Sequence, residues 1–309
     1  MYERVRDIGE KIKSMEIRGA GRIGRATALA LKYFSEDFKG SKEEFLKELE
    51  EVKNYLLSTR PTAVSLRNAI YYVVNRKQGS TLEELKESII KNAEDFIKRS
   101  EEALQIIGKY GAGRIPDGAT ILTHCNSSVA IQCIVQAYRD GKKIKVFNTE
   151  TRPWLQGHIT ARALAKEGID VTMIVDSAVR YFMRDIDIVV VGADTIASNG
   201  AVINKIGTSQ IALAAHEARV PFIVCAETYK FSPETVIGKL VKIEERDPRE
   251  IANPEDFPRV KFRNPVFDAT PPEYIDAIVT ELGVISPYLA YEIIKEVMNV
   301  GIEGKEDRH

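Results

Sequence analysis

Apolar residues recur every three to four positions through the first third of the chain, with charged residues on the opposite face. This spacing is typical of amphipathic helices. The segments that show it are residues 1–15, 22–37, 42–57, 62–75 and 81–110. Thr81 marks the expected start of the last helix, because a threonine oxygen caps the free N–H groups of a first turn. We therefore predict a smaller all-helical domain over residues 1–114.

The pattern changes after a stretch rich in glycine and proline at residues 110–118. Short apolar runs then alternate with helical segments. The runs are residues 119–125, 143–150, 170–176, 187–194 and 221–227, and residues 266–275 are expected to add a further strand and turn. Strands that are apolar throughout are covered on both faces, as in a parallel sheet between helices. The fold class predicted for residues 115–309 is therefore α/β.

Composition limits the classes of partner. The 309 residues are 44% hydrophobic and 29% charged, and the net charge is -1. No overall basic field is present to attract nucleic acid, so any anionic ligand must be held by locally placed arginine and lysine side chains. The amino-terminal segment is charged, and no apolar run reaches the roughly 18 residues of a membrane-spanning helix. We expect a cytoplasmic protein with no membrane or nucleic acid partner.

Neither the cysteines nor the histidines have the spacing of metal ligands. The residues are Cys125, Cys133, Cys225, His124, His158, His216 and His309. An odd number of cysteines without a CxxC motif argues against a disulfide framework and a zinc site. Cys133 and Cys225 lie within apolar segments and are expected in the core. We predict no metal site.

Residues 19–24 match the glycine motif G-x-G-x-x-G of dinucleotide-binding proteins. That motif requires a preceding strand and a following βαβ unit, and neither is predicted here, so no nicotinamide cofactor is expected. A tight turn into a helix fits better, since glycine lets backbone N–H groups approach an anion. Arg18 and Arg22 flank the turn and favour an anion over a simple interhelical connection.

Polar residues follow directly on the predicted strands, at the edge where open parallel sheets bind ligands. Cys125 ends one strand and precedes Asn126, Ser127 and Ser128, which can cap a helix. The positive end of that helix would stabilise a thiolate, which could serve as base or nucleophile. The alternative is an inert, half-buried thiol.

Asp194 ends another apolar run. Burial beside the strand would raise the pKa of its carboxyl group, which could then act as a general acid. A helix cap or turn residue is the alternative, and Asp176 occupies an equivalent position.

Several side chains could bind phosphate. They are Arg18, Arg60, Arg67, Asn204, Lys205 and Lys230. Most surface cations are simply solvated. Arg60 precedes Pro61 at the start of a helix, and Arg67 follows two turns later on the same face, so the two arginines could hold one anion.

Seven segments together resemble a known family. They are Arg18–Ala20, STRPTAVSLRNA (58–69), THCNSS (123–128), ETRPWLQG (150–157), GADTI (192–196), NGAVINKIGT (199–208) and AETYKF (226–231). The family contains methylthioribose-1-phosphate isomerases, archaeal ribose-1,5-bisphosphate isomerases and regulatory subunits of translation initiation factor 2B. The resemblance implies a helical amino-terminal domain and a Rossmann-like carboxy-terminal domain.

The resemblance also implies roles for individual residues. Cys125 and Asp194 match the catalytic pair of the isomerases, which the factor 2B subunits lack. The positions matching family residues around the substrate are Arg18, Gly19, Ala20, Arg60, Gln156, Asn204 and Lys205. Gly21 stands where methylthioribose-1-phosphate enzymes usually have proline, which favours the bisphosphate branch. Candidates near a second phosphate are Arg22, Arg67, Ser127, Ser128 and Lys230.

The expected reaction is conversion of ribose 1,5-bisphosphate to ribulose 1,5-bisphosphate in archaeal AMP and nucleoside salvage. Asp194 would protonate the ring oxygen, and Cys125 would remove the proton from carbon 2; a hydride shift is the alternative. Rival interpretations are a methylthioribose-1-phosphate isomerase of methionine salvage, a non-enzymatic regulator of translation initiation and a nicotinamide-dependent oxidoreductase. The resemblance further implies a homo-oligomer, dimeric or hexameric, and suggests AMP as an activator.

Overall fold

The first third of the chain forms five helices, as predicted. The computed structural model describes residues 2–238 and 240–298. The helices are α1 Glu3–Lys13, α2 Ala20–Asp37, α3 Lys42–Thr59, α4 Val64–Asn75 and α5 Leu82–Arg114. Thr81 caps α5 as expected: its side chain accepts a hydrogen bond from the N–H of Glu84, whose carboxylate in turn accepts from the N–H of Thr81.

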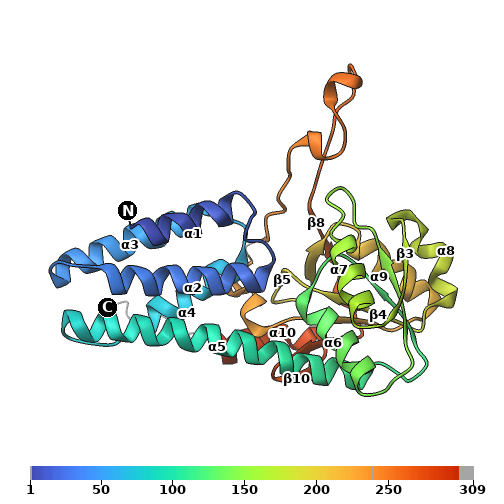
Figure 1. Ribbon diagram of the computed structural model, residues 1–309, viewed down its shortest axis with the longest axis horizontal. Helices are drawn as coiled ribbons and strands as arrows, with labels where there is room; N and C mark the ends of the chain where they lie inside the picture. The colour runs from blue at the N-terminus through green and yellow to red at the C-terminus, as the bar shows by residue number, and fades with distance from the viewer. Residues whose placement is uncertain (1, 239, 299–309) are drawn as a thin grey trace, which may run out of the picture.

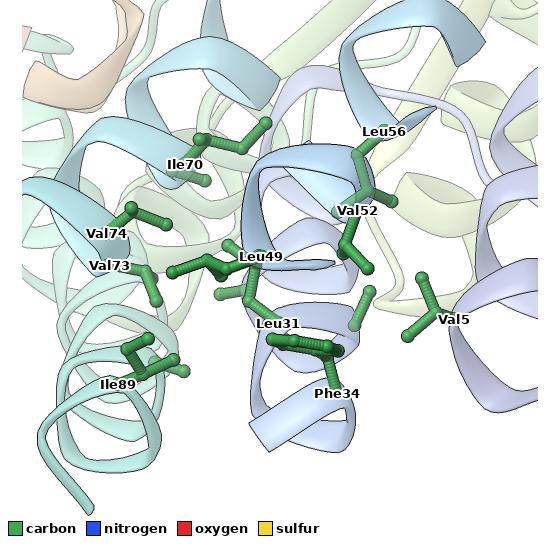
Figure 2. Close-up of a cluster of buried hydrophobic side chains, with 14 of the residues drawn as sticks. Val5, Leu31, Phe34, Leu49, Val52, Leu56, Ile70, Val73, Val74 and Ile89 are labelled. Carbon is green, nitrogen blue, oxygen red and sulfur yellow. The ribbon is translucent and has the colours of Figure 1, made fainter. Parts of the chain in front are cut away.

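A hydrophobic core holds the first four helices and the first half of α5 together. Figure 2 shows Leu31 and Phe34 of α2 surrounded by apolar side chains of the neighbouring helices. The ring of Phe34 stacks on Phe45 of α3, with 5.2 Å between ring centroids, and meets Tyr2 edge to face at 5.1 Å. Phe34 is therefore the centre of an aromatic cluster, a geometry that adds to the free energy of burial.

Seven strands form the main sheet, in the order β10-β9-β7-β4-β1-β2-β3. The strands are β1 Thr120–Thr123, β2 Lys145–Thr149, β3 Asp170–Ile174, β4 Ile188–Gly192, β7 Phe222–Cys225, β9 Ala277–Thr280 and β10 Gly283–Ile285. All pair in parallel except β10, which is antiparallel to β9. The five predicted strands are confirmed, and β9 and β10 extend the sheet beyond them.

Helices cover both faces of this sheet, as its uniformly apolar strands require. Alternate strand residues belong to two separate clusters. One packs against α5, α6 Ser128–Arg139 and α7 Gly157–Lys166, and the other against α8 Val179–Phe182, α9 Thr208–Ala218 and α10 Ala290–Met298. Cys133 and Cys225 are buried in the first cluster with their sulfur atoms 3.5 Å apart, which confirms them as core residues.

A second, antiparallel sheet was predicted only in part. It consists of β5 Thr195–Ile196, β6 Val202–Lys205 and β8 Phe267–Thr270. The strand and turn expected at residues 266–275 are β8 and the 3-10 turn Pro272–Tyr274. The β5–β6 hairpin begins directly after β4 and folds back over the end of the main sheet.

Helix α5 belongs to both cores. Its residues Leu85 to Phe96 pack with the other helices, whereas Ala103 to Ala112 pack against α6 and the sheet. Figure 1 shows α5 running from beneath the helical part to beneath the sheet. The proposed division after residue 114 stays a prediction, because the packing makes α5 a shared element.

One long loop was not anticipated. Between Glu245 and Pro265, which form an isolated bridge, the chain projects away from the body of the molecule (Figure 1, orange). It contains the short 3-10 turns Pro248–Glu250 and Pro254–Asp256. Of the helices in the described part of the chain, none combines the length and apolar composition needed to cross a membrane.

Replacement of Phe34 by alanine is expected to lower the free energy of unfolding by about 3–5 kcal/mol, because the deletion leaves a cavity at the centre of the aromatic cluster. Chemical denaturation measures this. Leu240→Ala is the control, since that side chain is 91% exposed, and its effect should be near zero. Equal losses in the two variants would contradict the packing described here.

Candidate active site

The carboxyl ends of β2, β1, β4 and β7 lie side by side, because these neighbouring strands are parallel. Gly192 at the end of β4 pairs with Cys225 at the end of β7. Asp194 and Glu227 each come two residues after this pair. Cys125 follows β1 at the same edge. Strand pairing thus brings together residues that are up to about a hundred positions apart in sequence.

The backbone at this edge is strained. Cys125, Thr151 and Leu155 have φ angles of 65°, 63° and 57°, in the left-handed region that side chains other than glycine rarely adopt. Such conformations persist only where surrounding contacts hold them, and they cluster at functional sites. Here the N–H of Cys125 donates to Thr151 Oγ1 at 2.9 Å, and its carbonyl accepts from Thr160 Oγ1 at 2.7 Å.

Asp176 forms hydrogen bonds to this strained loop, and these bonds distinguish its role from that of Asp194. Its two carboxylate oxygens accept the backbone N–H groups of Thr151 at 2.8 Å and Arg152 at 2.7 Å. The sequence left the two aspartates equivalent. The hydrogen bonds identify Asp176 as a loop-holding residue, and Asp194 therefore remains the better candidate acid.

His124 was not singled out as a functional residue, yet it organises the edge. It is buried, with Nδ1 2.6 Å from Thr149 Oγ1 and Nε2 2.9 Å from the carbonyl oxygen of Ile206. That carbonyl can only accept, so Nε2 carries the hydrogen. Burial lowers the pKa of His124 to about 4, and the ring is neutral. It ties β1 to the loop after β6.

The Cys125 thiol is protonated at neutral pH, which corrects the expected stabilised thiolate. The side chain is only partly exposed, and burial raises its pKa to about 11. The positive charge of Lys205 lowers that pKa, while Asp194 and Asp176 raise it. Desolvation outweighs the favourable charge. Lys205 and Asp194 are therefore both close enough to the thiol for their charges to affect its pKa.

Asp194 lines a small recess between the helical part and the sheet. The recess has a volume of about 20 Å³, and its lining includes Ala20 of α2, Arg60 and Ser65. Asp194 is half-buried and lies in the short connection between the end of β4 at Gly192 and the start of β5 at Thr195. Asp194, the expected general acid, therefore lines the same recess as two segments of the amino-terminal third of the chain.

A larger cavity of about 560 Å³ adjoins the recess. The residues that line both are Arg60, Thr62, Val64, Val241 and Lys242. The cavity walls carry five basic and three acidic side chains, namely Lys13, Arg60, Arg67, Lys242, Arg246, Glu234, Glu244 and Glu245. Its volume lies in the range of small-molecule sites.

Arg60 and Arg67 both line this cavity but face different carboxylates. Arg60 Nη2 lies 3.6 Å from Glu244 Oε2, whereas Arg67 pairs with Glu234 and donates to the carbonyl oxygen of Pro61. The two arginines therefore pair with different carboxylates, and their joint binding of one anion stays a prediction.

The segment at residues 18–22 is a turn into a helix, as expected, and it is preceded by α1 rather than a strand. Gly19 has φ 87° and α2 begins at Ala20. The Arg18 guanidinium lies 5.6 Å from the Trp154 ring centroid, and Arg22 is exposed. The requirements of a dinucleotide motif are not met.

The remaining candidates lie on β6 and around the strand ends. Asn204 Nδ2 donates to Thr208 Oγ1 at 3.0 Å, and Lys205 Nζ lies 5.1 Å from the Phe267 ring centroid. Ser127 caps α6 by accepting from the N–H of Ala130 at 3.4 Å, and Ser128 begins that helix. The Oε1 atom of Gln156 is buried without a hydrogen-bond partner in the described part of the chain.

Lys230 belongs to a buried network that joins the two parts of the molecule. Its Nζ lies 2.6 Å from Glu227 Oε2, and the Tyr229 hydroxyl donates to Glu227 Oε1 at 2.8 Å. That hydroxyl is also 3.0 Å from Ser100 Oγ, to which Arg25 donates. Buried ion pairs need such additional hydrogen bonds.

Gly21 is needed where α2 meets this network. A Cβ at position 21 would lie 2.9 Å from Tyr229 Oη and 3.2 Å from Glu227 Oε1. Both atoms are buried and hydrogen-bonded, so neither can move aside freely. Any side chain at position 21 therefore conflicts with the Glu227–Tyr229 pair.

Comparison with known proteins agrees with this architecture. The model of the initiation factor 2 subunit family matches residues 16–287. The chain belongs to this family. The resemblance inferred from the motifs is thereby confirmed.

Members of the family that resemble this chain include enzymes and an initiation factor. A ribose 1,5-bisphosphate isomerase of Methanocaldococcus jannaschii is 57% identical over 294 residues, 94% of each chain. A methylthioribose-1-phosphate isomerase of Geobacter sulfurreducens is 40% identical over 92% of this chain and 88% of its own length. The solved structure of translation initiation factor eIF-2B from Pyrococcus horikoshii OT3 superposes with a TM-score of 0.82 at 34% identity, covering 93% of this chain and 98% of that chain.

The buried His124 predicts a pH dependence of stability. The unfolded histidine binds a proton near pH 6.5 and the folded one only near pH 4, so stability is lost as the pH falls between these values. The loss from pH 7 to pH 5 should be about 2 kcal/mol. Denaturation of the wild type and His124→Gln at both pH values measures it, and an identical pH dependence in the two proteins would contradict the prediction.

Gly21→Ala is expected to reduce stability by roughly 1–3 kcal/mol, because the added methyl group overpacks the buried network. Gly21→Ala combined with Tyr229→Phe should recover part of the loss, since the closest atom is then removed. Gly113→Ala in α5 is the matched control: its Cβ meets nothing within 4 Å, and helix propensity should make it neutral or stabilising. Thermal unfolding of the four proteins tests the steric conflict.

Proposed function

We propose that this protein is an isomerase that converts ribose 1,5-bisphosphate to ribulose 1,5-bisphosphate. The observation that carries the proposal is 57% identity, over nearly the whole chain, to a protein named for that activity. The site supports it physically, because a thiol and a carboxyl group follow neighbouring parallel strands at one edge of the sheet. The recess that Asp194 lines shares residues with a cavity that is lined by five basic side chains.

Asp194 and Cys125 would divide the proton transfers between them. Carbon 1 of the substrate carries a phosphate, so simple ring opening to a free aldehyde is blocked. Asp194 would protonate the ring oxygen as its bond to carbon 1 breaks, and Cys125 would accept the proton from carbon 2. The resulting enol is then protonated at carbon 1 while the hydroxyl on carbon 2 loses its proton. Hydrogen moves within one molecule, so no external oxidant or reductant is required.

Lys205 supplies the charge that this assignment needs. A thiol whose pKa is about 11 must lose its proton before it can act as a base. The buried Lys205 ammonium on β6 lowers the pKa of that thiol, as does a backbone hydrogen bond from Asn126. We assign it an electrostatic role in addition to substrate binding.

A hydride shift between carbons 2 and 1 is the alternative mechanism, and the protonated thiol favours it. The two mechanisms differ in the fate of the hydrogen on carbon 2. Turnover in deuterium oxide should place solvent deuterium on carbon 1 of the product if Cys125 exchanges the proton. A hydride shift retains the original hydrogen.

The remaining substrate contacts belong to the same proposal. Arg18, Gly19, Ala20, Gly21, Arg60, Gln156, Asn204 and Lys205 would surround the sugar phosphate, with Arg22, Arg67, Ser127, Ser128 and Lys230 near a second phosphate. Activation by AMP, assembly into dimers or a hexamer, and a cytoplasmic location also stay predictions.

Methylthioribose-1-phosphate isomerisation is the second candidate activity, because a relative with that name is 40% identical. Gly21 stands where methylthioribose-1-phosphate enzymes usually have proline, which favours ribose 1,5-bisphosphate as the substrate. Assays of both sugars with the same purified protein separate the candidates. Turnover of neither sugar would favour a non-enzymatic role such as that of the initiation factor.

Cys125→Ser and Asp194→Asn are each expected to lower kcat by at least about a hundredfold, the scale of losing a positioned acid or base. Circular dichroism and unfolding should show a retained fold, since each change is nearly isosteric. Ser177→Ala, at an exposed position after β3 at the same edge of the sheet, is a control for local disturbance. Near-normal activity in either catalytic variant would refute the assignment.

A further inference from the structure

Ser65 has a buried hydroxyl group that nothing in the described part of the chain satisfies. The residue lies in the first turn of α4 and is 1% exposed, and its Oγ has no hydrogen-bond partner. Leaving such a group unpaired costs about 1–3 kcal/mol, and few native groups remain so. The unpaired hydroxyl therefore calls for a ligand that is absent from the structure.

Ser65 makes no hydrogen bond to the backbone carbonyl that usually serves as the local partner of a serine in a helix. Serine and threonine inside helices normally bond to the carbonyl four residues earlier. In α2, Thr27 bonds to the Ile23 carbonyl at 2.8 Å and Ser35 bonds to the Leu31 carbonyl at 3.1 Å. For Ser65 the corresponding carbonyl is that of Pro61, which lies before the helix and accepts from Arg67.

Ser65 is one of the residues that line the recess beside Asp194. Arg60 also lines this recess, and the recess shares five lining residues with the larger cavity. Its volume of about 20 Å³ has room for one water-sized group. The polar residues that line it are Asp194, two cations and three hydroxyl-bearing residues, namely Arg60, Lys242, Thr62, Ser65 and Thr195. A hydroxyl group both donates and accepts hydrogen bonds.

We propose that Ser65 is a substrate-binding residue, whose hydroxyl pairs with an uncharged oxygen of the bound sugar next to Asp194. We take this oxygen to be a hydroxyl or the ring oxygen, because either can pair with the Ser65 hydroxyl and fits a space for one water-sized group. The assignment rests on the proposed function, because it takes a sugar phosphate to be the ligand. It adds a residue that the motif resemblance did not single out, although Ser65 lies within residues 58–69.

Ser65→Ala tests the assignment. The variant should lower kcat/KM for ribose 1,5-bisphosphate by roughly 3- to 10-fold, the equivalent of one neutral hydrogen bond. Its melting temperature should stay the same or rise, because an unpaired buried hydroxyl is removed. A purely structural role would give the opposite result, a lower melting temperature with unchanged kinetics, and would overturn the proposal.

Thr270→Val is the matched control. Thr270 Oγ1 is also buried and has no hydrogen-bond partner among the residues that the structure describes. Thr270 lies on β8 and lines neither the recess nor the larger cavity. Valine has nearly the same shape as threonine. This variant should keep wild-type kinetics and an equal or higher melting temperature. An equal kinetic loss in both variants would show a general effect of removing buried hydroxyls and would overturn the role of Ser65.

Calorimetric binding separates this proposal from the proposed function. Ribose 1,5-bisphosphate and methylthioribose 1-phosphate are titrated into the wild type and Ser65→Ala. If the wild type binds one of these sugars without converting it, the isomerase assignment fails and the Ser65 assignment does not. Weaker binding of that sugar by Ser65→Ala would then still support the role of Ser65. Equal binding by both proteins, or binding of neither sugar by the wild type, overturns the Ser65 assignment.

Discussion

Parallel pairing of β2, β1, β4 and β7 is the constraint on which the site depends. It places the ends of four strands at one edge, where each chain must leave the sheet and its backbone groups need new partners. Thr151, Asp176 and Thr160 provide them with short side-chain hydrogen bonds. The left-handed backbone at Cys125 is held in this way, at a place where the charges of Lys205 and Asp194 affect the thiol.

The helical part contributes residues to the recess at this edge of the sheet. The starts of α2 and α4 bring Ala20, Arg60 and Ser65 to the recess beside Asp194. Two further connections hold the parts in place, namely α5, which is shared by both cores, and the buried Glu227–Tyr229–Ser100 network. A cavity formed between two rigid parts can position a small ligand at both walls.

Groups that a stable core would avoid are gathered at this edge. Strained residues follow β1 and β2, a charged pair is buried after β7, and Ser65 and Gln156 carry unpaired polar atoms. Some departures occur elsewhere, at the left-handed residues Met15, Arg219 and Arg259 and at the buried hydroxyl of Thr270. The capping box of α5 and the aromatic cluster around Phe34 follow the local rules. Departures at the sheet edge are those that binding and chemistry would require.

The sequence alone determined the helices, the five apolar strands, the family and the positions of Cys125 and Asp194, because these depend on local periodicity and on motifs of adjacent residues. Strands β5, β6, β9 and β10 were missed, since each has four residues or fewer and is too short to show a distinct pattern. The motifs contained His124 and Ser65, but their importance comes from partners present or missing across the fold. The pKa of Cys125 likewise depended on burial, which no local pattern reveals. Only the tertiary structure decided which aspartate holds the loop and which carboxylates face Arg60 and Arg67, because these are contacts between residues far apart in the chain.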